Sequence, residues 1–210
     1  IMDAVEGAKE RRVRSVIITS QGGFFCAGGD LNALRERRSL PEVERQGQIE
    51  LLHDVIRAIR NCPLPVIAAV KGGAAGAGAS IALACDFIVM EAGAKFTAAY
   101  VKAGLVPDGG LTASLARMIP RPLAMEMCVL ARPVTAERMQ ALGAVNAVVD
   151  VDQVMAEAHV FADAVAAGPR EAQARIRMMV AAGYEQTELA QLDLERDAMA
   201  HAAGGDEAAE

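Results

Sequence analysis

The chain has 210 residues, of which 53% are hydrophobic and only 3% aromatic, so its core must be built from aliphatic side chains and Met. A net charge of −6 argues against a general nucleic-acid-binding protein, because such proteins neutralise phosphates with Lys and Arg. No apolar run is long enough to span a membrane. The four cysteines and three histidines show no metal-ligand spacing, which predicts reduced thiols, a cytoplasmic protein and no metal site.

Short apolar runs and helical periodicity alternate through the first half of the chain. The run at 13–20 predicts a buried strand that leads into a Gly-containing loop. Apolar residues spaced by three and four predict a helix from about Pro41 to the segment "NCPLP". The run "PVIAAV" at 65–70 predicts a second buried strand. After a stretch of small residues, "DFIVMEA" at 86–92 and "AKFTAAY" at 94–100 predict two more strands.

The second half changes from mixed α/β structure to helices alone. Helices are expected in "GGLTASLARMI", "PLAMEMCVLA" and "TAERMQALG", where Thr135 suits the N-cap and Gly143 the C-terminal stop. The segment "AVNAVVD" predicts a last strand, and helices are expected near 152–167, 169–182 and 187–203. The sequence therefore predicts an α/β core over residues 1–150 and a helical portion over 151–210.

The small-residue stretch "VKGGAAGAGASIALACD" at 70–86 admits three readings. A dinucleotide-binding fingerprint fails, because the G-x-G-x-x-G pattern begun at Gly76 and Gly78 meets Ile81. A serine nucleophile at Ser80 would need a histidine base, and the chain has none between residues 53 and 159. The third reading is an oxyanion site, since a helix N-terminus among small residues offers unpaired backbone N–H groups.

A second small-residue loop favours the oxyanion reading. The segment "FFCAGGDL" at 24–31 also follows a predicted strand. An oxyanion hole needs two donors, which often come from different segments. A simpler alternative stays open, in which both loops only allow a strand and a helix to pack closely.

Together these motifs resemble the crotonase family, the enoyl-CoA hydratase/isomerase superfamily. The matching segments are "FCAGGDL", the stretch at 70–86, "AGLVPDGGLTASLARMI" at 103–119 and "GAVNAVV" at 143–149. The resemblance implies a spiral of ββα units, an acyl-CoA thioester as substrate, and no cofactor apart from the coenzyme A of that substrate. It also implies that the usual N-terminal strand pair and closing C-terminal segment lie outside this sequence.

The resemblance further implies a C-terminal helical region that builds a trimer or a dimer of trimers. We expect the contacts to involve the apolar residues of that region, which are Val154, Met155, Val165, Ile176, Met178, Met179 and Val180.

By motif position, the resemblance assigns the two oxyanion donors to the backbone N–H groups of Gly29 and Ala77. These would stabilise the thioester enolate. Contacts with coenzyme A or substrate are expected at Ala27, Gly28, Asp30, Leu31, Gly76, Ser80 and Tyr100. Asp30 is expected to fix its own loop and not to react.

Hydratases of this family use two glutamates, whose positions correspond here to Ser80 and Tyr100. Neither residue supplies a carboxylate at neutral pH, so ordinary water addition is not expected. Asp108 in "VPDGG" remains. Members resembling ring-opened phenylacetyl-CoA isomerases carry an aspartate there, and one base suffices to move a proton between two carbons. We therefore expect an isomerase in which Asp108 is the base.

Several alternatives compete with this reading. Asp108 would also suit the N-cap of the helix that follows it. The 4-chlorobenzoyl-CoA dehalogenases carry a nucleophilic aspartate at this position, but they also use a tryptophan, and this chain has none. An atypical hydratase and a non-catalytic acyl-CoA-binding protein complete the alternatives.

Overall fold

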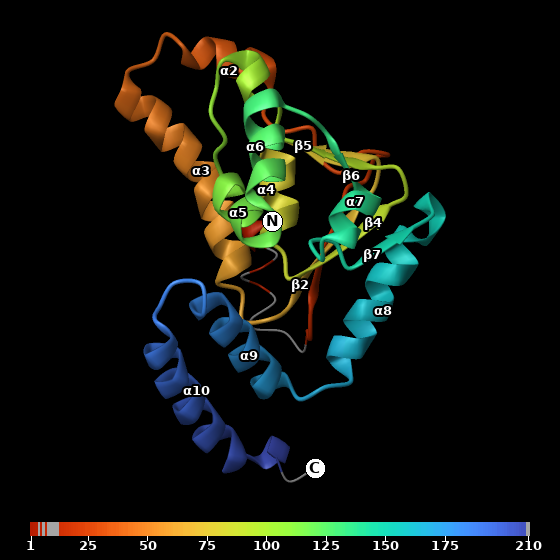
Figure 1. Cartoon of the computed structure of the whole chain (residues 1–210), viewed down its shortest axis with the longest axis vertical. Helices are drawn as coiled ribbons and strands as arrows, with labels where there is room; N and C mark the ends of the chain where they lie inside the picture. The colour runs from red at the N-terminus through yellow and green to blue at the C-terminus, as the bar shows by residue number, and fades with distance from the viewer. Residues whose placement is uncertain (4, 6, 8–12, 209–210) are drawn as a thin grey trace.

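A computed structural model describes residues 1–3, 5, 7 and 13–208 (Figure 1). Its strands form two sheets. The first sheet is entirely parallel, with the order β1 (Val16–Ile18), β2 (Val66–Val70), β4 (Phe87–Glu91), β7 (Ala147–Val149). In the second sheet, β5 (Lys95–Thr97) lies between the parallel strand β3 (Gly73–Ala75) and the antiparallel strand β6 (Val134–Thr135).

The chain visits the two sheets in turn. β2 and β3 are consecutive and lie in different sheets, as do β4 and β5. After β1, Cys26 forms a parallel bridge with Ala74 of β3, so this first turn also reaches the second sheet. Each pair of strands is followed by helical structure, which gives the ββα spiral expected from the sequence.

Helices cover the spiral on two sides. α3 and α4 to α6 lie together on one side in Figure 1, and α8 lies on the other. The helices of the core are α2 (Leu31–Arg37), α3 (Glu42–Arg60), α4 (Ala77–Leu83), α5 (Leu111–Met118), α6 (Arg121–Leu130) and α7 (Ala136–Ala141). They are followed by α8 (Val154–Ala166), α9 (Arg170–Ala182) and α10 (Glu188–Ala203). The last two project from the lower end of the molecule.

β2 is buried on both faces, which explains its uninterrupted apolar sequence. Val66, Ala68 and Val70 belong to the main core beneath α3, α4 and α5, whereas Ile67 and Ala69 contact α8. α8 was expected in the C-terminal helical portion, yet it packs on the main sheet because Val154 and Ala158 cover that second face. The division of the chain at residue 150 stays a prediction.

Most predicted elements are present, with one correction and three additions. The strand expected at 94–100 ends at Thr97, and the 3₁₀ helix η1 (Ala99–Ala103) follows it. The sequence patterns did not predict α2, β3 and β6. The predicted cap of α7 is confirmed, because the Thr135 side chain accepts a hydrogen bond from the Arg138 N–H. The stop at Gly143 is consistent with its φ of 79°.

Candidate active site

The two small-residue loops lie against each other. The N–H of Ala75 donates to the carbonyl of Cys26 over 2.9 Å. A Cβ added to Gly78 would overlap that same carbonyl oxygen, so only glycine fits there. From the other loop, a Cβ on Gly28 would lie 3.0 Å from the carbonyl oxygen of Ala75. The close-packing interpretation therefore holds for both loops, and the same packing brings them together.

This packing places the two expected N–H donors on adjoining segments. Gly29 lies in the exposed loop before α2, and Ala77 is the first residue of α4. A Cβ on Gly28 would lie only 3.4 Å from the Ala77 nitrogen. Within the described ranges, neither the Gly29 nor the Ala77 N–H donates a hydrogen bond to protein. A ligand oxygen would therefore displace no protein acceptor from either group, and their role as oxyanion donors stays a prediction.

The Asp108 carboxylate accepts a hydrogen bond from a tyrosine. The hydroxyl of Tyr100, on η1, donates to Oδ1 of the half-buried Asp108 carboxylate over 2.8 Å. Burial raises the pKa of Tyr100 well above its ordinary value, so its hydroxyl stays protonated and serves as the donor at neutral pH.

The interpretation of Asp108 as a helix cap is wrong. The N-cap of α5 is Gly110, in the left-handed region, and no side chain caps the helix. Asp108 accepts the Leu111 N–H through its main-chain carbonyl, at 3.2 Å, and not through its carboxylate. The carboxylate therefore does not cap α5, which was the structural alternative to a role in catalysis.

Ser80 is hydrogen-bonded to the loop that carries Asp108. Its side chain is fully buried, and its hydroxyl donates to the main-chain carbonyl of Asp108 over 3.0 Å. On the other side, a Cβ on Gly76 would lie 4.0 Å from the Tyr100 hydroxyl. Asp108, Tyr100 and Ser80 thus form one cluster beside the residue that precedes Ala77.

The remaining predicted residues lie in the loop before α2. The Asp30 carboxylate caps α2 by accepting the Asn32 N–H over 2.8 Å, which confirms the expectation that it fixes its own loop. Ala27 is exposed in this loop, and Leu31 is the first residue of α2. Contacts of these residues, and of Ser80, with coenzyme A or substrate stay predictions.

Sequence reasoning did not place α3 at the site. A Cβ on Gly109 would lie 3.1 Å from the Leu52 side chain, so α3 flanks the Asp108 loop. Gln48 lies one turn earlier on α3, and its Oε1 is buried without a described hydrogen-bond partner. The helical spacing of apolar residues showed which face of α3 turns inward, but it carried no information about the loop that this face contacts.

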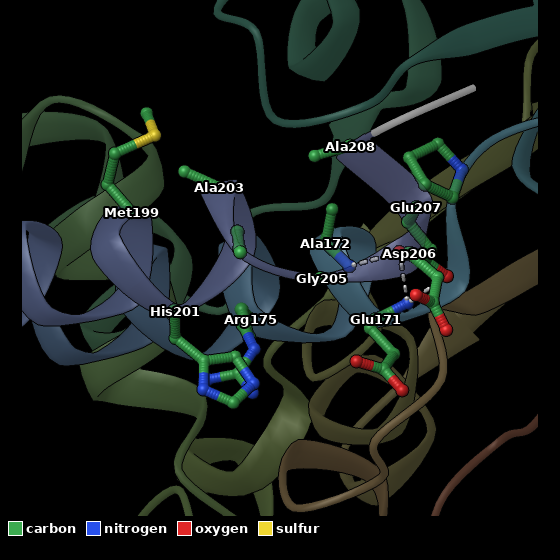
Figure 2. Close-up of a pocket in the computed structure, with 13 residues that line it drawn as sticks. Glu171, Ala172, Arg175, Met199, His201, Ala203, Gly205, Asp206, Glu207 and Ala208 are labelled. Carbon is green, nitrogen blue, oxygen red and sulfur yellow. Dashed lines mark hydrogen bonds between the residues drawn. The ribbon is translucent and has the colours of Figure 1, made fainter.

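Two cavities lie away from this cluster. One, of about 610 Å³, is bounded by α9, α10 and the segment after α10 (Figure 2). There the Glu207 carboxylate accepts the N–H groups of Glu171 and Ala172 at the start of α9. These backbone bonds, the Glu171 one foremost, lower the pKa of Glu207. The other, of about 770 Å³, lies between α9 and the core and includes Arg60 and Arg177. Neither contains a predicted site residue.

The described residues lack two other kinds of feature, a metal site and a membrane-spanning helix. The described residues contain no group of three or more His, Cys, Asp or Glu side chains that could hold a metal ion. None of the helices that the structure describes is long and apolar enough to cross a membrane.

The ββα spiral defines the class of fold, and it brings two small-residue loops together. Comparison with known proteins then defines the family. The family model described as "Enoyl-CoA hydratase/isomerase" matches residues 1–209. The chain belongs to the enoyl-CoA hydratase/isomerase family, which confirms the expected superfamily and fold class.

Individual relatives carry both activities in their names. The chain is 40% identical to a probable enoyl-CoA hydratase of Rhodobacter capsulatus over 186 residues, covering 87% of this chain and 70% of that protein. It is 34% identical to the 1,2-epoxyphenylacetyl-CoA isomerase of Escherichia coli, covering 90% and 72%. The crystal structure of an enoyl-CoA hydratase from Polaromonas sp. matches with a TM-score of 0.95 and 42% identity, over 100% of this chain and 82% of that one.

Proposed function

We propose that this protein is an acyl-CoA isomerase that shifts a double bond, with Asp108 as the base. The observation that carries the proposal is the Asp108 carboxylate, which does not cap α5 and is bonded to the Tyr100 hydroxyl, itself beside Gly76. A carboxylate that is held in place but has no structural partner beyond a neutral hydroxyl is available for proton transfer.

The proposed reaction uses three groups of this chain. The thioester carbonyl oxygen accepts the N–H groups of Gly29 and Ala77, which stabilise negative charge on that oxygen. Asp108 takes an α- or γ-proton, and the electron pair of the broken C–H bond moves into the dienolate. The same carboxyl group then returns the proton to the other carbon. One base and two N–H donors complete the cycle, and the redox state does not change.

The residues at the hydratase positions support isomerisation over water addition. Ser80 is fully buried and bonded to the Asp108 carbonyl, so it is not placed to activate water. Tyr100 keeps its proton, because burial raises its pKa. An atypical hydratase remains the second candidate, because the Rhodobacter capsulatus relative is named a probable hydratase.

The test is exchange of substrate protons with solvent in Asp108→Asn. Acyl-CoA thioesters are screened in D₂O by NMR, since exchange reports enolate formation whatever the final product. Removal of the base should lower exchange and isomerisation by roughly 10²-fold or more, while the melting temperature stays close to wild type. Asp163→Asn, at an exposed position on α8, is the matched control. Wild-type exchange in Asp108→Asn would overturn the proposal.

We also propose that the enzyme is a cytoplasmic trimer or dimer of trimers. α9 and α10 contain no buried residue, and Ile176, Met178 and Val180 are more than half exposed. Val154 and Val165 were expected in the same contacts, but both are buried within this chain. The proposed contacts therefore involve α9 and α10, without those two residues.

A further inference from the structure

We infer that Tyr100 is a positioning residue for the base: it holds Oδ1 of Asp108, so that Oδ2 takes the substrate proton. The inference rests on the proposed function, since it concerns the same carboxylate. The only described hydrogen bond to the Asp108 side chain comes from Tyr100. Oδ2 has no described partner and is not fully buried, and Asp108 as a residue is half-buried.

Tyr100 is well placed to hold a carboxylate still. Its partly buried ring packs against the main core, which limits the movement of its hydroxyl. Its own backbone is fixed by the Leu105 N–H, which donates to the Tyr100 carbonyl over 3.0 Å and closes η1. The 2.8 Å hydrogen bond therefore ties the Asp108 side chain to a residue that is held by other contacts.

Ser80 holds the main chain of the same residue. Its hydroxyl donates to the Asp108 carbonyl from α4, while Tyr100 donates to the carboxylate from η1. Asp108 is thus fixed at two points by two elements. Ser80 and Tyr100 occupy the two positions that correspond to the glutamates of the hydratases. Here both of them donate hydrogen bonds to Asp108.

The chemical nature of the donor matters as much as its position. A neutral hydroxyl orients a carboxylate but does not form an ion pair with it. A Lys or Arg at the same distance would bind the ionised carboxylate more strongly and make it a weaker base. A protonated tyrosine therefore fixes the carboxylate without an ion pair that proton transfer would have to break.

The test is Tyr100→Phe, which removes one oxygen atom and keeps the ring. We expect kcat for the exchange or isomerisation reaction to fall about tenfold, with KM within a factor of about two, because the lost bond orients the base and does not bind substrate. The matched control is Tyr184→Phe, at the other tyrosine of the chain, which is 60% exposed and packs over Arg117. This control should keep the wild-type kcat.

A double-mutant cycle separates positioning from direct action on the substrate. If Tyr100 acts through Asp108, Tyr100→Phe causes no further loss in the Asp108→Asn background. A full further loss would show that Tyr100 acts on substrate directly and would overturn the inference. An unchanged kcat in Tyr100→Phe alone, with Asp108→Asn inactive, would also overturn it but leave the proposed function standing. Wild-type exchange in Asp108→Asn would instead remove the proposed function itself.

Discussion

Gly109 and Gly110 have the same backbone conformation but very different surroundings. Their φ values are 59° and 72°, in the region that favours glycine. A Cβ on Gly109 would lie 2.9 Å from the Ser80 Cβ and 3.1 Å from the Leu52 side chain. A Cβ on Gly110 would have no neighbour closer than the Arg60 guanidinium at 3.9 Å. The pair therefore separates backbone strain from overlap next to the proposed base.

We expect Gly110→Ala to lower the free energy of unfolding by about 1 kcal/mol, through strain alone. Gly109→Ala should cost about 1–3 kcal/mol more, because Ser80 and the Asp108 loop must move apart. Gly109→Ala should also slow the exchange of substrate protons with D₂O, whereas Gly110→Ala should leave that exchange rate nearly unchanged. Urea unfolding and exchange rates measured on both variants check this. Equal losses in the two variants would show that Ser80 does not constrain the loop.

Single residues were predictable where their contacts are local. Thr135 accepts an N–H three residues ahead, and this cap followed from a short sequence pattern. Asp30 was expected only to fix its own loop, and its role as the cap of α2 was not predicted. The contact between Tyr100 and Asp108 was not predictable, because it depends on η1, which replaces the end of an expected strand. The interpretation of Asp108 as the N-cap was wrong because Gly110, in the left-handed region, is the N-cap and α5 begins at Leu111.

At the scale of elements, Arg177 attaches α9 to the core. Its guanidinium donates to the carbonyls of Ile59, Arg60 and Cys62 at the end of α3. It also pairs with Asp86 over 2.7 Å, and its side chain is only 10% exposed. One side chain thus satisfies carbonyls that the end of a helix leaves unpaired.

Arg177→Met should lower the free energy of unfolding by about 3 kcal/mol, because Asp86 and the carbonyls lose a largely buried partner. Arg175→Met is the control on the same helix, since no described hydrogen bond or ion pair involves Arg175. It should change stability by no more than about 0.5 kcal/mol. Thermal and urea unfolding of the two variants provide the comparison. A loss below about 1 kcal/mol in Arg177→Met would mean that α9 is held mainly by other contacts.

Elements were predictable where one local pattern decides them. The apolar runs of β2 and β4 identify buried strands, and the periodicity of α3 identifies its inner face. β3 is a different case, because the sequence "GAA" carries no strand pattern. It forms because Gly73 takes a φ of 130° that lets the backbone approach Lys95 of β5 closely. Its pairing is a property of the assembled spiral.

At the scale of the whole molecule, the apolar surfaces of α9 and α10 lack a partner within the described chain. Met178, Val180 and Leu189 are 64%, 62% and 76% exposed. Sedimentation should therefore show a trimer or hexamer. Met178→Glu should dissociate it, because burying a carboxylate in an apolar contact is costly. Val43→Glu, at a 76% exposed position on α3, should leave the assembly intact. A stable and active wild-type monomer would contradict the proposal.

The contact between Gly78 and Cys26 constrains how the site can fluctuate. α4 approaches the Cys26 backbone so closely that a Cβ on Gly78 would overlap the Cys26 carbonyl oxygen, so neither segment can move toward the other. Ala75 reinforces this by donating to the same carbonyl oxygen. We therefore expect a thermal opening that withdraws the Gly29 N–H to break the hydrogen bond between Ala75 and Cys26 and so to disturb the Ala77 N–H as well. The two proposed donors are lost or presented as a pair, so the enzyme spends no reorganisation energy on aligning one with the other while charge develops on the bound oxygen.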